Sequence, residues 1–126
     1  MNNQLFINNI MRKYLDYSSR LHLNCIRLDG GTNHNHDLKL VEICSQLRKN
    51  KIDFICRPII ELIFAEKNEV KFKKQLIPDI LAFTQPNPKV IEITNTEKKD
   101  HAENKSYPRE FDVVVVGVDD DLEGIM

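Results

Sequence analysis

Two carboxylic acids stand out because they lie in segments whose composition otherwise favours buried β-strands. Asp79 follows Pro78 at the start of an apolar run, and Glu92 lies within the alternating segment 89–94. Aspartate is a poor strand former, and a carboxylate is costly to bury among apolar neighbours. If the two strands are neighbours in a hairpin-like arrangement, their alternation lets both carboxylates project to the same side of the sheet.

Such a pair suggests a metal site, because two carboxylates held close together repel each other and a hard divalent cation relieves that repulsion. Mg²⁺ typically binds one or two carboxylates and keeps several waters. An ion of this kind can activate water and stabilise charge on a phosphodiester. Asp79 and Glu92 are therefore candidate ligands for Mg²⁺ or Mn²⁺. The alternative interpretation is structural: Asp79 simply starts a strand, and Glu92 is one polar residue of a half-exposed strand.

The segments Pro78-Asp79 and Glu92-Ile93-Thr94 resemble the motif of the PD-(D/E)XK nuclease superfamily, which includes restriction endonucleases and Holliday-junction resolvases. The resemblance implies a metal-dependent endonuclease that hydrolyses phosphodiester bonds in DNA, either duplex or branched. It implies that Asp79 and Glu92 ligate Mg²⁺ or Mn²⁺. It also implies a restriction-endonuclease-like core of α-β-β-β-α-β order with a mixed sheet, which residues 37–118 can supply.

The chain departs from the family at the position of the lysine that helps to activate the attacking water. Thr94 occupies that position, two residues after Glu92, and brings no positive charge. Some members of the family carry the lysine on the following helix, where Lys98 is the nearest candidate and Lys99 and Lys105 lie further on. Two functions therefore stay open: an active nuclease, or a nuclease-like fold that binds nucleic acid or protein without catalysis.

A further glutamate often lies upstream in this family, on the first core helix or near the first strand. Glu42 fits the helix and Glu61 fits the strand. We favour Glu61 slightly, because it interrupts an apolar run in which a glutamate has no packing role.

Other motifs are weaker. His34-Asn35-His36 followed by Asp37 has a spacing that could hold a metal, but a loop rich in Asn and His is more commonly a solvated loop. Basic residues that could contact phosphates gather in two segments, Lys71–Lys74 and Lys98–Arg109.

The expected elements alternate between helices and strands, as in an α/β sandwich with a mixed sheet. Helices are expected over 4–20 and 38–50, the second capped by Asp37, and a short polar helix over 96–106. A loop is expected over 29–36. The expected strands are 22–28, 54–56, 59–65, 70–73, 77–84, 89–94 and 111–118. The last contains four consecutive valines, a pattern typical of a strand buried on both faces.

Length and composition indicate one globular domain of 126 residues, with an N-terminal helix and extension over 1–30. The net charge of −1 excludes a polybasic protein that coats nucleic acid by charge alone. The three cysteines cannot all pair within the chain, and Cys44 and Cys56 are expected in the core. We expect a cytoplasmic protein without membrane spans. The apolar content of Leu5–Leu15 predicts a homodimer through that helix.

Overall fold

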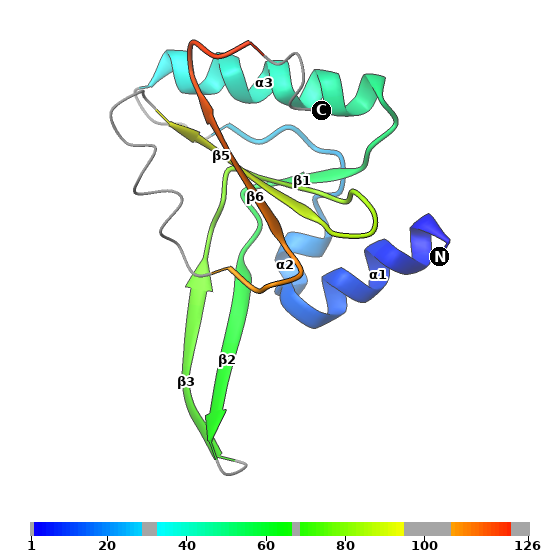
Figure 1. Ribbon diagram of the computed structural model, residues 1–126, viewed down its shortest axis with the longest axis vertical. Helices are drawn as coiled ribbons and strands as arrows, with labels where there is room; N and C mark the ends of the chain where they lie inside the picture. The colour runs from blue at the N-terminus through cyan, green and yellow to red at the C-terminus, as the bar shows by residue number, and fades with distance from the viewer. Residues whose placement is uncertain (1, 29–32, 67–68, 95–106, 122–126) are drawn as a thin grey trace.

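The computed structural model describes residues 2–28, 33–66, 69–94 and 107–121, and between 63 and 73 only the backbone is described. Three helices and six strands follow one another along this part of the chain (Figure 1). The helices are α1 (Asn3–Tyr14), α2 (Tyr17–Arg20) and α3 (His34–Lys49). The strands are β1 (Phe54–Cys56), β2 (Ile60–Glu66), β3 (Glu69–Leu76), β4 (Ile80–Ala82), β5 (Lys89–Thr94) and β6 (Asp112–Gly117).

The main sheet is mixed and has the strand order β1-β4-β5-β6. The pairs β1–β4 and β4–β5 are antiparallel, whereas β5 and β6 are parallel. Helix α3 covers one face of this sheet, and α1 packs against the other. The expected α/β class with a mixed sheet is therefore confirmed.

The face beneath α3 is filled by side chains that recur every three or four residues along the helix. Leu40, Ile43, Cys44 and Leu47 form this stripe and are at most 1% exposed. They pack on residues of alternate positions in all four strands: Phe54, Cys56, Ile80, Ala82, Ile91, Ile93 and Val116. The Sγ atoms of Cys44 and Cys56 are 3.5 Å apart in this layer, so the prediction that both cysteines belong to the core is confirmed.

The opposite face is covered by α1. Its apolar residues Phe6, Ile7 and Ile10 are buried against Ile55, Leu81, Val90 and other side chains of this layer. Among its large apolar side chains, Leu5 is exposed. The expectation of a dimer through this helix assumed a spare apolar stripe, but the stripe is used to cover the sheet of its own chain.

Strands β2 and β3 form a separate two-stranded antiparallel sheet, a hairpin that extends away from the rest of the molecule (Figure 1). The expected strands 59–65 and 70–73 correspond to it. Its base is joined to the body by the bridge between Leu15 and Ile60 and by a hydrogen bond from the Asp16 amide to the Ile59 carbonyl.

Four expectations about the elements are wrong. The expected helix 4–20 breaks at Leu15, whose extended backbone pairs with the hairpin, and α2 starts afresh after Asp16. The expected loop 29–36 ends early, because Asn33 rather than Asp37 caps α3 and the helix begins at His34. Segment 22–28 forms only one bridge, from Leu23 to Ile55.

The fourth concerns the valine-rich strand, which forms as β6 but lies at an edge of the sheet, with Val113 38% exposed. Strand β4 also spans fewer residues than the expected 77–84, since it begins after Pro78 and Asp79. The expected helix 96–106 lies outside the described residues. In the described part of the chain, no helix has the length and apolar character that crossing a membrane requires.

Asp16 makes the start of α2 sensitive to pH. Its carboxylate accepts hydrogen bonds from the Ser19 amide at 2.9 Å and from the Ser18 hydroxyl at 2.8 Å. Hydrogen bonds from Ser19, then Ser18, and the charge of Arg20 hold the pKa of Asp16 below its ordinary value of 3.8. Because the pKa is lower in the folded state, this contribution to stability is present above that value and is lost as pH falls through the lowered one.

We therefore expect Asp16→Ala to lower the free energy of unfolding by about 1 kcal/mol at neutral pH, and by less in acid. Chemical denaturation at several pH values measures the difference. Asp112→Ala, at an exposed aspartate, is the control and should change stability by less than about 0.5 kcal/mol. An Asp16→Ala effect that grows in acid would contradict this assignment.

Candidate functional site

Asp79 lies where the ladder between β4 and β5 ends. The last backbone pair joins Ile80 to Ile91, and Pro78 lacks the N–H that would continue the ladder. The Asp79 side chain takes the place of a backbone acceptor on β4, because its Oδ2 accepts the Ile93 amide hydrogen at 2.7 Å. A carboxylate at this position is thus held by the backbone of the neighbouring strand.

This arrangement places Asp79 beside Glu92. Asp79 is one residue before Ile80 on one strand, and Glu92 is one residue after Ile91 on the antiparallel partner. The two strands are antiparallel neighbours, which is the condition that the sequence argument for this carboxylate pair required. Glu92 is only 6% exposed, whereas the Asp79 side chain is 18% exposed. The pair combines a buried carboxylate with one at the margin of the solvent.

Tyr107 donates a hydrogen bond to Glu92. Its hydroxyl donates to Glu92 Oε1 at 2.5 Å, a short distance typical of a bond to an ionised acceptor. Burial, this bond and the negative charges of Glu92 and Asp79 raise the pKa of the Tyr107 hydroxyl above its ordinary value of 10.0. Tyr107 consequently stays protonated and keeps donating to Glu92. That the charge of Asp79 acts on Tyr107 as well indicates that the three side chains share one site.

His36 reaches the same site from the first turn of α3. Asn33 caps this turn by accepting the His36 amide hydrogen, and the His36 Nε2 atom lies 3.0 Å from Asp79 Oδ1. The other ring nitrogen is 3.9 Å from Asp37, too far for a hydrogen bond. His34 is exposed. The histidines of the sequence motif are thus separated, and only His36 meets a carboxylate.

Thr94 lies at the end of β5, two residues after Glu92. Its carbonyl accepts the Val118 amide hydrogen at 3.0 Å, which continues the pairing with the chain after β6. Among the described residues, Thr94 Oγ1 is the buried side-chain oxygen without a hydrogen-bond partner. A buried hydroxyl without a partner costs free energy, so this atom is suited to a water or a ligand group.

The other predicted site residues do not contact the pair within the described structure. Glu42 is exposed on α3 and forms an ion pair with Lys39, whose Nζ also donates to the Asp120 carbonyl. Glu61 lies in the hairpin opposite Gln75. Lys98 lies outside the described residues, as do Lys99, Lys105 and the side chains of Lys71 and Lys73. Lys74 is exposed near the base of the hairpin.

Sequence reasoning missed two members of the site. Tyr107 belongs to the connection into β6 and contacts Glu92 fifteen positions away, a proximity that no local pattern encodes. His36 belongs to a noted motif, but its partner lies forty-three positions away. Each contact joins segments that are distant in the chain and that only the packing of the elements brings together.

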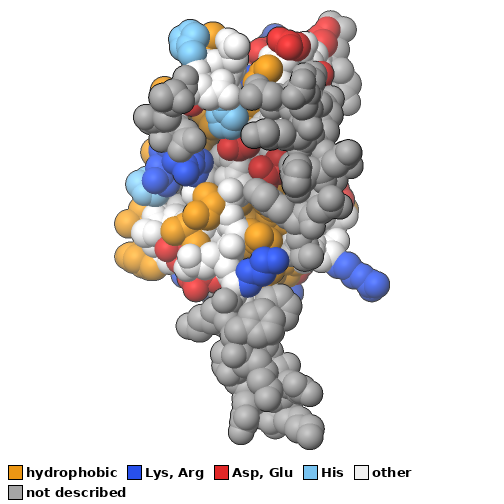
Figure 2. All heavy atoms as spheres, turned by 90° about the vertical axis from the view of Figure 1, so that its left-hand side faces the viewer, with side chains coloured by type: hydrophobic (Ala, Val, Ile, Leu, Met, Phe, Trp, Pro, Cys, Tyr) orange, Lys and Arg blue, Asp and Glu red, His pale blue; other side chains and the backbone are white. Residues whose placement is uncertain are grey.

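The assembled group has two carboxylates, an imidazole and a phenol at the end of the sheet where α3 begins. Figure 2 views the molecule from that side and shows acidic and histidine side chains next to one another, with basic side chains nearby. Within the described residues, no three or more His, Cys, Asp or Glu side chains are arranged to hold a metal ion. A cation here would rest on Asp79 and Glu92 with waters or small shifts of neighbouring groups.

Comparisons with known proteins give no match, whether the chain is compared with protein-family models, with curated proteins or with solved structures. The geometry of the site therefore carries the functional argument.

The Tyr107–Glu92 bond predicts how stability changes in alkali. Because the pKa of Tyr107 is raised on folding, its contribution is complete below 10.0 and is lost as pH rises towards the folded value. Tyr107→Phe should lower the free energy of unfolding by about 1.5–3 kcal/mol at neutral pH, since a hydrogen bond to a buried carboxylate is lost.

The variant should also lose less stability than the wild type on going to alkaline pH, as measured by denaturant unfolding across that range. Tyr17→Phe, at a tyrosine that is 73% exposed, is the matched control and should follow the wild type. Equal alkaline losses in Tyr107→Phe and the wild type would show that the hydroxyl is not held in this way.

Proposed function

We propose that this protein is a metal-dependent nuclease of the PD-(D/E)XK type, which hydrolyses phosphodiester bonds in DNA with Mg²⁺ or Mn²⁺ held by Asp79 and Glu92. The observation that carries the proposal is the hydrogen bond from the Ile93 amide to Asp79, because it holds the two acidic residues side by side at the end of adjacent strands. One carboxylate of the pair is buried and the other is partly exposed, and this arrangement suits a hydrated divalent ion.

The order and direction of the elements support the proposal. Setting aside the separate β2–β3 hairpin, α3 is followed by β1, β4 and β5 as an antiparallel meander, and β6 lies parallel to β5. Parallel neighbours need a crossover of a dozen or more residues. The described elements supply the first helix and the four strands of an α-β-β-β-α-β core, and the helix that the resemblance implies falls in the crossover, outside the described residues. The Asp of the motif then directly precedes the second strand of that core, and the Glu lies in the third.

The residues present fit a hard divalent cation. Asp79 uses Oδ1 and Oδ2 for His36 and the Ile93 amide, but each carboxylate oxygen has a second lone pair. Glu92 accepts a hydrogen bond from the Tyr107 hydroxyl, which holds its carboxylate beside Asp79. When bound, such an ion supplies an activated water and stabilisation of the negative charge that develops on the phosphate.

The protein's own groups would position this chemistry. The Ile93 amide fixes the rotamer of Asp79, and Tyr107 fixes that of Glu92, so neither carboxylate needs to reorganise. The Thr94 hydroxyl can hydrogen-bond a water at the end of β5. It supplies no positive charge, so a lysine beyond residue 94 has to take that role in an active nuclease, and Lys98 is the nearest in sequence.

A second candidate function is a nuclease-like fold that binds nucleic acid or protein without catalysis. Thr94 in the position of the lysine favours it, as does the engagement of both Asp79 oxygens by groups of the protein itself. The two functions share the site but differ in the need for a metal ion.

The decisive measurement is cleavage of a mixed set of DNA substrates, including duplex and branched forms, with Mn²⁺ or Mg²⁺. Asp79→Asn and Glu92→Gln should each reduce cleavage by about 100-fold or more, because the charge that holds the ion is lost. Both changes keep an oxygen that can accept the structural hydrogen bonds. Glu42→Gln and Glu61→Gln are the control variants, because these two glutamates do not contact the pair within the described structure.

Cleavage by the wild type that survives both Asp79→Asn and Glu92→Gln would refute the site. Absence of wild-type cleavage with every divalent ion would favour the second candidate function. A loss of activity in Glu61→Gln or Glu42→Gln would instead add that glutamate to the site.

The contact between His36 and Asp79 predicts a preference among metals. Imidazole is a better ligand for transition metals than for Mg²⁺. His36→Ala should therefore weaken Mn²⁺ binding by about tenfold or more while changing Mg²⁺ binding less, measured by calorimetric titration with each metal. His34→Ala, at the exposed first residue of the same helix, is the control. Equal losses for the two metals would mean that His36 only orients Asp79.

A further inference from the structure

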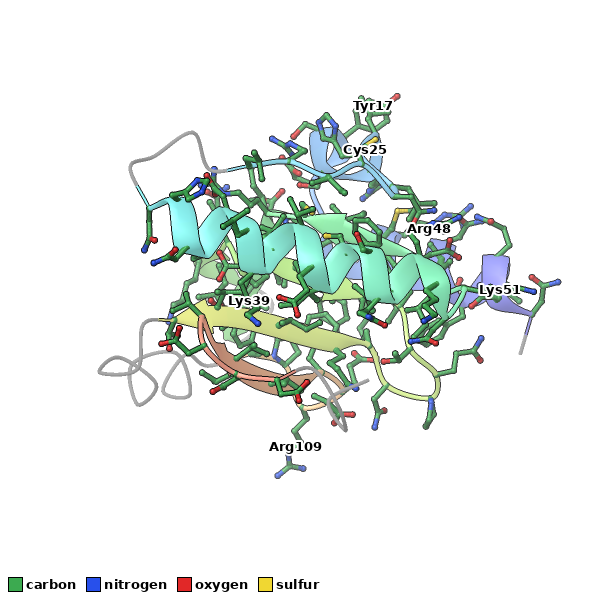
Figure 3. All side chains as sticks on the ribbon, turned by 90° about the horizontal axis from the view of Figure 1, so that it is seen from above. Tyr17, Cys25, Lys39, Arg48, Lys51 and Arg109 are labelled. Carbon is green, nitrogen blue, oxygen red and sulfur yellow. The ribbon has the colours of Figure 1, made fainter. Side chains whose placement is uncertain are left out.

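Strand β6 is the outermost strand of the main sheet, beside β5 (Figure 3). Natural sheets commonly blunt such an edge with lysine, proline or a bulge. Here the strand reads Asp-Val-Val-Val-Val-Gly, so its one charged residue is Asp112 at the start, and the four valines carry no lysine, proline or bulge. Val113 is 38% exposed on it. The strand thus has the composition of a pairing surface rather than of a protected edge.

The hydrogen bonds around β6 reveal which of its residues face outwards. The Asp112 amide donates to the Pro88 carbonyl, and the Val118 amide donates to the Thr94 carbonyl. In a parallel pair, alternate residues direct both backbone groups to the same neighbour, so the even-numbered residues of β6 face β5. Val113, Val115 and Gly117 therefore direct their N–H and C=O groups to the outer edge.

Only part of that edge is available. The outward amide of Gly117 donates to Asp120 Oδ2 at 2.7 Å, and a Cβ at Gly117 would lie 3.1 Å from the same oxygen. Asp120 therefore closes the end of the strand, and glycine leaves it room to do so. For Val113 and Val115, no described strand or side chain pairs with the outer edge. Four backbone groups on these two valines can accept a new strand.

We propose that this edge binds the same edge of a second copy of the chain, with the two β6 strands antiparallel. Val113 of each copy then pairs with Val115 of the other, which satisfies all four groups on each strand, and the twofold axis passes beside Val114. Antiparallel pairing of identical strands is self-complementary, as a twofold interface requires. The two main sheets become one continuous sheet. This inference does not depend on the nuclease proposal.

Charges at the two ends of β6 favour the antiparallel direction. Arg109 lies just before the strand and points outwards in Figure 3. Asp119 lies just after the strand and is exposed. Neither side chain forms an ion pair with another residue in the described ranges. Antiparallel pairing brings each Arg109 to the end of the strand where Asp119 of the second copy lies, and this charge complementarity selects a second copy over an unrelated strand.

Sedimentation velocity over a range of concentrations tests the proposal on the full chain. The wild type should be a dimer that dissociates on dilution. Val115→Pro should be a monomer, because proline removes an outward N–H and its ring blocks the approach of a strand, while the bonds to β5 remain. Val115→Thr keeps the N–H and the β-branched shape, so it is the matched control and should stay dimeric.

Charge exchange provides a test that does not depend on the folding of the proline variant. Arg109→Glu should weaken the dimer by roughly tenfold, since like charges then meet at both ends of the pair. Adding Asp119→Lys should restore it. A monomeric wild type at every concentration, or a dimer that neither Val115→Pro nor Arg109→Glu weakens, would overturn the proposal.

Discussion

The hydrogen bond from the Ile93 amide to Asp79 is the interaction on which the candidate site depends. Pro78 ends the backbone ladder between β4 and β5, and without a replacement the Ile93 amide would be a buried donor with no acceptor. The Asp79 carboxylate supplies the acceptor and in doing so is fixed beside Glu92. One residue thus completes the hydrogen bonding of the sheet and places a carboxyl group beside Glu92.

Around this pair, each further contact comes from a different layer. The first turn of α3 brings His36 to Asp79, and the chain entering β6 brings Tyr107 to Glu92. Helix α3 packs on one face of the main sheet, and Tyr107 packs against the apolar layer on the other face. The group is restrained from three sides, because a backbone amide, a helix and a half-buried phenol contact its two carboxylates. Rigid acidic groups of this kind need little reorganisation when a cation binds.

Strand β6 links the interior to the surface. Its even-numbered residues complete the sheet beside β5, whereas its odd-numbered residues direct backbone groups outwards, and Asp120 limits the open part to Val113 and Val115. The valine run therefore serves two purposes. It supplies Val116 to the core and leaves a short unpaired edge. The same strand order that brings Tyr107 to Glu92 thus also creates the surface through which we infer self-association.

The sequence by itself determined the α/β class with a mixed sheet, the place of Cys44 and Cys56 in the core and the strands of the main sheet. These depend on spacing and on short-range pairing, which local patterns encode. Tertiary structure decided the rest. Leu15 left its helix because it pairs with Ile60, and the valine run became an edge because, among the described strands, only β5 pairs with it. His36 and Tyr107 joined the site through contacts between distant segments, whose partners depend on how the layers pack and not on the residues next to them in the chain.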